Sequence, residues 1–206
     1  VRDALGNGLL FQERQSANPF KFGIIASTDT HLGTPGAVDE SSFQGHGGAG
    51  KSFRSSIPEG LPDDIEFNPG GLAVAWAEEN SRSSIFNAFK RKEVYGTSGP
   101  RFIVRFFIGD SLDQNLCNNP DNISYAYANA TPMGGTIALG SLSKPAIFIS
   151  ASADSMIKDQ FIEKLQIVKG VVRNGELFTS VYDVKVTDAP SKLDLSNCEV
   201  TGSGKK

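Results

Sequence analysis

A series of strand-like runs in the second half of the chain constrains the possible folds most strongly. These runs are rich in β-branched and aromatic residues, several alternate in polarity, and Gly, Asn, Asp and Pro separate them. They cover residues 101–108, 136–139, 146–151, 165–172 and 177–186. Asn174-Gly175 separates the last two runs, and this dipeptide is typical of a two-residue hairpin turn. The sequence therefore predicts a mostly β module over residues 101–206.

The first hundred residues combine helical and strand-like segments instead. Residues 1–16 carry a weak helical leucine stripe that includes two glycines. The short apolar runs 22–26 (FGIIA) and 71–77 (GLAVAWA) are typical of strands that are buried on both faces, as in a parallel sheet. We therefore expect a fold that is α/β over residues 1–100 and mostly β thereafter, with a boundary near residue 100.

A helix is predicted over residues 82–92. Ser81 is a favourable N-cap, and Ile85, Phe86 and Phe89 form an apolar face at helical spacing. The basic residues of the segment then face water. Trp76, between small alanines in the preceding strand-like run, is expected to belong to the core.

Residues 45–52 (GHGGAGKS) match the phosphate-loop pattern G-x-x-x-x-G-K-[ST]. A working phosphate loop needs a strand that ends at the first glycine and a helix that begins at the lysine, because the helix N-terminus binds the phosphates. No apolar strand precedes Gly45, and Pro58 follows Lys51 within two turns. We therefore do not expect a nucleotide site.

Asp29 and His31 directly follow the run FGIIA. Side chains at the carboxyl end of a buried strand face the crevice where α/β folds bind ligands, and both residue types bind divalent transition metals. A turn cap at Asp29 and a backbone partner for His31 explain the same letters equally simply. The chain has only two histidines, His31 and His46, and a catalytic zinc site usually has three protein ligands. A metal site would therefore need ligands from outside this sequence.

The charge balance excludes some classes of partner. Lys and Arg total 20 against 23 Asp and Glu, a net charge of −3, so no basic field attracts a nucleic-acid backbone. No stretch approaches the run of about 20 apolar residues that spans a membrane, and the N-terminus does not resemble a signal peptide. We expect neither nucleic-acid nor membrane partners.

The two cysteines, Cys117 and Cys198, have no C-x-x-C spacing that would suggest structural zinc. A disulfide between them and two unrelated thiols are both compatible with the sequence. The compartment stays open between cytoplasm and export.

Two long segments resemble a bacterial domain-of-unknown-function family, family 3604, related to the PHP (polymerase and histidinol phosphatase) metallohydrolases. They are GIIASTDTHLGTPGAVDE (23–40) and NPGGLAVAWAEENSRSSIFNAFKRKEVYGTSGPR (68–101). The later segment LQIVKGVVRNGELFTSVYDV (165–184) resembles the β-rich C-terminal part of the same family. Asp29 and His31 fall on the Asp and His of the last metal motif of the PHP-like enzymes.

The resemblance implies a fold and a place in a larger protein. Residues 1–100 would be the last elements of a PHP-like distorted β/α barrel, and residues 101–206 a β-rich, sandwich-like module. The H-x-H motif and the further ligands that such enzymes carry on earlier strands do not occur here, and the chain begins without Met. The resemblance thus implies a C-terminal segment that is inactive, or nearly so, on its own.

The resemblance also implies the chemistry. A divalent metal (Mn, Zn or Fe), held by Asp29, His31 and ligands elsewhere in the full-length protein, would assist hydrolysis of a small-molecule phosphate or sulfate ester. His46 as an acid and Lys51 as a charge clamp would lie on a loop over that site, and Arg101 would bind an anion. A solvated loop and a surface salt bridge are the corresponding structural alternatives for these three residues.

The alternative function is not enzymatic. In that interpretation the β-rich half is a binding or interface module without chemistry of its own. Exposed apolar strand edges would promote self-association in either case.

Overall fold

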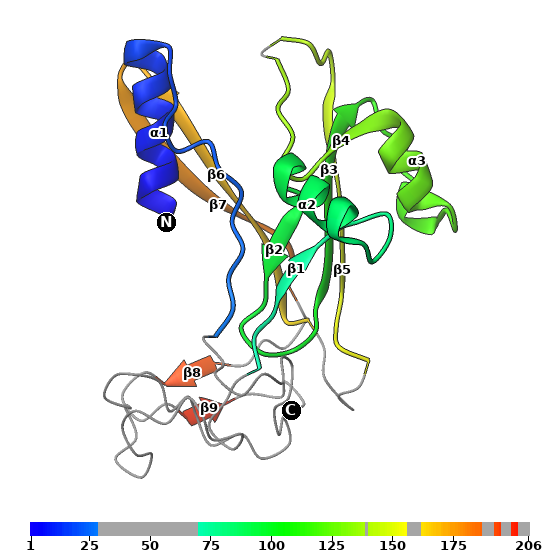
Figure 1. The fold of residues 1–206 in the computed structure, drawn as a ribbon. Coiled ribbons are helices and arrows are strands. Elements are labelled where there is room, and N and C mark those ends of the chain that lie inside the picture. The colour runs from blue at the N-terminus through cyan, green and yellow to red at the C-terminus, as the bar shows by residue number, and fades with distance from the viewer. Residues whose placement is uncertain (29–69, 139, 156–161, 187–191, 195–198, 202–206) are drawn as a thin grey trace. The chain divides into compact units, whose positions relative to one another are not determined.

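The computed structural model describes residues 1–28, 70–138, 140–155, 162–186, 192–194 and 199–201. It is a mixed α/β structure with three α-helices and small antiparallel sheets in these ranges (Figure 1). The chain divides into two compact units, one of Val1–Phe22 with Lys158–Lys206 and one of Gly23–Ile157. Residue 100 lies within the second unit, so the boundary expected there stays a prediction.

The first unit contains a helix and two hairpins. Helix α1 (Arg2–Gln15) packs along the hairpin of β6 (Lys164–Arg173) and β7 (Glu176–Val186) (Figure 1). The short strands β8 (Lys192–Asp194) and β9 (Glu199–Thr201) pair with each other.

The hairpin turn is the one that the sequence predicted. Arg173 pairs with Glu176, so only Asn174 and Gly175 form the loop, with φ angles of 53° and 80°. Positive φ at both positions is typical of the primed turn, whose twist matches that of the flanking strands. The Arg14 side chain of α1 donates to the Gly175 carbonyl at 3.2 Å.

The two glycines in α1 are contact points with other parts of the unit. A Cβ atom at Gly6 would lie 2.2 Å from a methyl group of Leu177, and one at Gly8 would lie 2.2 Å from the Asn18 side chain. Both glycines are buried. They lower helix propensity, but they let the helix approach its neighbours closely.

The second unit contains two antiparallel sheets. In the first, β1 (Ala73–Ala75) pairs with β2 (Val94–Gly96), and helix α2 (Arg82–Arg91) connects the two strands. The second has the order β4 (Ala130–Pro132), β3 (Ile103–Asp110), β5 (Pro145–Ser152). The 3-10 turn Leu116–Asn118 and helix α3 (Asn122–Asn129) connect β3 to β4.

The core of this unit lies between the three-stranded sheet and α3. Its buried members are Phe107, Leu116, Ala126 and Phe148. The Phe107 and Phe148 rings are stacked with centroids 6.1 Å apart, and the Tyr127 ring meets Phe107 edge-on at 5.0 Å. The strand runs 101–108, 146–151, 165–172 and 177–186 are confirmed as strands within a few residues. Residues 136–138 form no strand, and residue 139 lies outside the described ranges.

The prediction for residues 22–26 is wrong. They form no strand, and Phe22, Ile24 and Ile25 are exposed. Residues 23–28 instead run along the face of β2, where the Ala26 backbone lies against Gly96. The run 71–77 does contain β1, but its strand has three residues and an antiparallel partner. All strand pairs in the described ranges are antiparallel, and no closed barrel occurs among them.

Helix α2 has the predicted ends but not the predicted buried face. The Ser81 hydroxyl accepts a hydrogen bond from the Ser84 amide at 3.2 Å, which confirms the N-cap. However, Phe86 is 59% and Phe89 46% exposed, whereas the small residues Ser84 and Ala88 are buried. Small side chains let the helix approach its neighbours closely, so the bulkier apolar face points outward. In the described ranges, no helix is long and apolar enough to cross a membrane.

Candidate functional site

The backbone immediately before Asp29 is anchored by a side-chain hydrogen bond. The Gly71 amide donates to the Thr28 hydroxyl at 2.8 Å. Gly71 has no room for a side chain, because an added Cβ would lie 2.5 Å from the Thr97 carbonyl oxygen and 2.6 Å from the Thr28 methyl group. The Thr97 amide donates to the Leu72 carbonyl at 2.8 Å, and the Leu72 amide donates to the Thr97 hydroxyl at 3.0 Å. Thr28 is therefore held at the end of the two-stranded sheet where β1 begins and β2 ends.

Residues 23–28 follow β2 in the same chain direction. A Cβ atom at Gly23 would lie 2.8 Å from Cβ of Lys92, and one at Gly96 would lie 2.4 Å from the Ala26 carbonyl oxygen. The segment thus passes Lys92 first and Gly96 later. Thr28 lies near Thr97, directly after the end of β2. Asp29, the first predicted metal ligand, is the next residue.

Most of the residues that the sequence singled out lie outside the described ranges. These are Asp29, His31, His46, Lys51 and the phosphate-loop match 45–52. Their predicted roles stay predictions. Within the described ranges, no three His, Cys, Asp or Glu side chains gather at one place.

Arg101 forms an ion pair. Its guanidinium lies 3.5 Å from the Asp154 carboxylate, and its backbone amide donates to the same Oδ2 atom at 2.8 Å. The Asp154 side chain is buried, whereas that of Arg101 is about half exposed. This contact matches the salt-bridge alternative, and the anion-binding role of Arg101 stays a prediction.

A polar cavity of about 420 Å³, which the sequence did not predict, lies at the other end of β1. Its lining comprises Trp76, Ala77, Glu78, Arg91, Glu93, Arg105, Tyr127 and Pro132. Trp76, which was expected in the core, is only partly buried there. An available signal was Arg105, a charge in the middle of the apolar run RFIVRFFI.

Tyr127 connects two charged residues in this cavity. Its hydroxyl donates to the Glu93 carboxylate and accepts from the Arg105 guanidinium at 2.5 Å. Burial of the phenol, and then its hydrogen bond to Glu93, raise the pKa of Tyr127 to about 12. Glu93 is only 3% exposed, and the Tyr127 hydroxyl gives its buried carboxylate a hydrogen-bond partner.

Arg91 binds both carboxylates of the cavity. Its guanidinium lies 3.1 Å from Glu78 and 3.4 Å from Glu93, and it also donates to the Trp76 carbonyl at 3.3 Å. Glu78 additionally accepts from the Ser84 hydroxyl at 2.8 Å. Hydrogen bonding from its own backbone amide, from Ser84 and from Arg91 lowers the pKa of Glu78. Glu78 therefore supports the start of α2.

The family model described as "Protein of unknown function (DUF3604)" matches residues 1–204. The chain belongs to this family. No curated protein and no solved structure matches the chain. For a DUF3604 chain the family description states no activity, so any function has to be argued from the residues.

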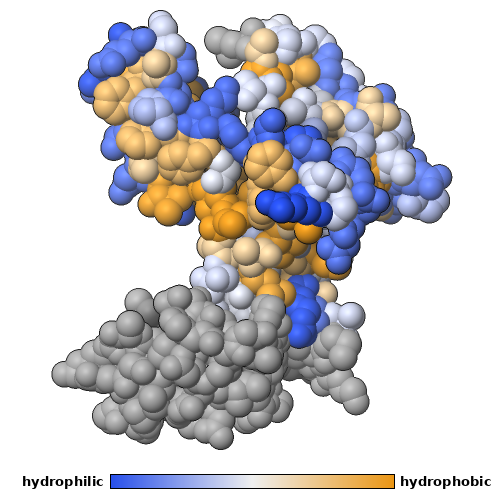
Figure 2. All heavy atoms as spheres, viewed as in Figure 1, coloured by the Kyte–Doolittle hydropathy of each residue, from blue (hydrophilic) through white to orange (hydrophobic). Residues whose placement is uncertain are grey.

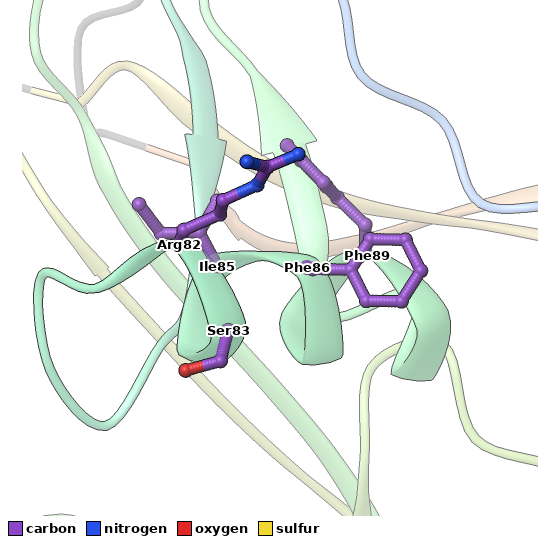
Figure 3. A pocket seen from close by; sticks show the side chains of 5 residues that line it. All are labelled: Arg82, Ser83, Ile85, Phe86 and Phe89. Atoms are coloured by element: carbon purple, nitrogen blue, oxygen red, sulfur yellow. The ribbon is translucent and has the colours of Figure 1, made fainter.

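This DUF3604 chain also has an apolar hollow of about 820 Å³ beside α2. The described side chains that line it all come from α2 and are shown in Figure 3: Arg82, Ser83, Ile85, Phe86 and Phe89. Hydrophobic side chains reach the surface at other places too (Figure 2).

Cys117 is exposed in the 3-10 turn, and Cys198 lies outside the described ranges. Their pairing stays a prediction.

Proposed function

We propose that this chain is part of a PHP-related, metal-dependent hydrolase of small-molecule phosphate or sulfate esters. Membership of the DUF3604 family over residues 1–204 and the resemblance of residues 23–40 to a metal motif support the proposal. Asp29 and His31 are two of the metal ligands in it.

The observation that carries the proposal is the hydrogen bond between the Gly71 amide and the Thr28 hydroxyl. A metal ligand must be held within a few tenths of an ångström of its place, and rigid elements hold it better than loops. Asp29 directly follows Thr28, the residue that this hydrogen bond anchors, and this supports the choice of Asp29 as a metal ligand.

The donor set fits a divalent transition metal such as Mn, Zn or Fe, because carboxylate and imidazole both bind such ions. When bound, the metal would lower the pKa of a water molecule and neutralise charge on the ester. The 206 residues hold only two histidines, so we place the remaining ligands in another part of the full-length protein. The segment alone is then inactive or nearly so.

In this proposal, residues 1–100 are the last elements of a distorted β/α barrel and residues 101–206 form a β-rich, sandwich-like module. His46 and Lys51 act from the loop after the ligand pair, His46 as an acid and Lys51 as a charge clamp. Arg101 contributes to anion binding.

The test is an assay of a longer protein that contains these residues together with an upstream H-x-H segment. With manganese and aryl phosphate or aryl sulfate esters, we expect turnover and bound metal. Asp29→Asn and His31→Gln should each lower both metal content and kcat/KM, whereas Asp113→Asn, which alters an exposed carboxylate outside the ligand motif, should change neither. The absence of ester hydrolysis in the long protein with metal bound would contradict the proposal.

A second candidate function is that of an interface module. Phe178 and Tyr182, which lie on the same face of β7, are each about half exposed, and β6 and β7 pair only with each other among the described strands. Such a hairpin offers both an apolar face and free edges to a partner. Sedimentation of the chain tests this: self-association that Tyr182→Lys abolishes favours an interface, and a monomer at all concentrations counts against self-association.

A further inference from the structure

The cavity beside Trp76 contains an arginine whose orientation is fixed in advance. The Arg105 guanidinium carbon lies 3.2 Å from the centroid of the Trp76 ring, and the Trp76 indole N–H donates to the Val104 carbonyl at 3.1 Å. Stacking on an aromatic face and one hydrogen bond to Tyr127 hold the guanidinium plane. A ligand would therefore meet a donor group that has already lost most of its conformational freedom.

Arg105 differs from Arg91 in its charge partners. Arg91 contacts both Glu78 and Glu93, whereas no carboxylate in the described part of the chain makes an ion pair with Arg105. In the same ranges, only Nη1 of Arg105 makes a hydrogen bond, so its Nε and Nη2 atoms have no hydrogen-bond partner there. A partly buried guanidinium without a directly bound anion is costly, because charges taken from water need a partner.

We propose that this cavity binds the singly charged oxyanion group of a small molecule, a carboxylate or a sulfate monoester, through Arg105. The guanidinium edge can donate two parallel hydrogen bonds to two oxygens of such a group. At about 420 Å³ the cavity falls in the size range of small-molecule sites. The site lies at the opposite end of β1 from Thr28 and does not depend on metal binding at Asp29 and His31.

Glu93 limits the charge of the ligand. Its buried carboxylate lies next to Tyr127, on the far side of the hydroxyl from Arg105. This carboxylate would repel a second negative charge on the ligand, and the repulsion is stronger in a partly buried site because the effective dielectric constant is lower than in water. The cavity should therefore prefer singly charged groups to the dianions of inorganic phosphate or sulfate.

The test uses the only tryptophan of the chain as a probe. The intact chain is titrated at neutral pH and constant ionic strength with sodium acetate, sodium methyl sulfate or sodium sulfate, and sodium chloride makes up the balance. We expect a saturable change in Trp76 fluorescence with acetate or methyl sulfate, and weaker binding of the sulfate dianion. The relative affinities of acetate and methyl sulfate distinguish the carboxylate from the sulfate-ester source.

Arg105→Gln should weaken binding about ten- to hundredfold, as expected for loss of charge-assisted hydrogen bonds. Lys90→Gln, which removes one positive charge from exposed α2 in the same unit, should leave the affinity unchanged. Tyr127→Phe keeps the ring but removes the hydrogen bond to Arg105, so we expect a severalfold loss of affinity. This variant tests the proposal if Arg105→Gln does not fold. Lack of saturation in the unsubstituted chain, or an equal loss in Lys90→Gln, would overturn the proposal.

Discussion

Gly96 lies directly against the backbone of Ala26, so that a Cβ atom at position 96 would come within 2.4 Å of the Ala26 carbonyl oxygen and 2.8 Å of its nitrogen. These are backbone atoms, which cannot rotate away as a side chain can. Because position 96 has no side chain, residues 23–28 can lie close to the face of β2. A substitution at position 96 is therefore a sensitive test of that packing.

Gly96→Ala should lower the free energy of unfolding by about 1–3 kcal/mol, because the overlap can be relieved only by a backbone shift. The midpoint of urea unfolding measures this. Gly170→Ala is the matched control, since a Cβ atom there would meet only side-chain carbons at 3.6 Å and 3.9 Å. Equal effects of the two substitutions would show that residues 23–28 do not pack against β2.

Thr28→Val should leave the Gly71 amide without its acceptor while preserving the shape of the side chain. An unsatisfied buried amide costs about 1–3 kcal/mol, and urea unfolding should show a loss in this range. Thr28→Ser retains the hydroxyl and should lose much less. If Val and Ser variants unfold at the same denaturant concentration, the Thr28 anchor contributes nothing.

The raised pKa of Tyr127 predicts a loss of stability at high pH. In the unfolded chain this phenol ionises near its usual pKa of 10.0, whereas in the folded chain its pKa is about 12. The folded state therefore keeps the proton longer, and the contribution of Tyr127 is complete below pH 10 and is lost as the pH rises to about 12. Unfolding measured across this interval should show a decline that Tyr127→Phe reduces. An unchanged decline in Tyr127→Phe would assign the effect to other groups.

Gly175→Ala should destabilise the β6–β7 hairpin. Gly175 has φ of 80°, where an L side chain adds strain of roughly 1–2 kcal/mol. Asn174→Gly is the control, because glycine adopts the φ of 53° at position 174 without strain. Amide hydrogen exchange of β6 and β7 should be faster in Gly175→Ala and little altered in the control. Unaltered exchange in both variants would contradict the importance of the turn.

The candidate site could be predicted only in part. The letters after FGIIA drew attention to Asp29 and His31, and the structure adds the anchor at Thr28, which no local pattern indicates. The cavity of Arg105, Tyr127 and Glu93 escaped prediction because its members come from β3, α3 and the residues after α2. Of these, only Arg105 was unusual in its sequence context.

The sequence by itself determined the elements whose cause is local: α1, the Ser81 cap, the strands β3 and β5, and the hairpin at Asn174-Gly175. Cap chemistry, turn dihedrals and residue periodicity act over a few positions, so they can be read without neighbours. Only the tertiary structure decided that Phe86 and Phe89 point outward. It also decided that residues 23–28 lie along the face of β2 instead of pairing with its edge. Those outcomes depend on how closely the small residues Ala88 and Gly96 let other segments approach. The size of a side chain matters in this way only where two segments pack together, and local sequence patterns do not say which segments do so.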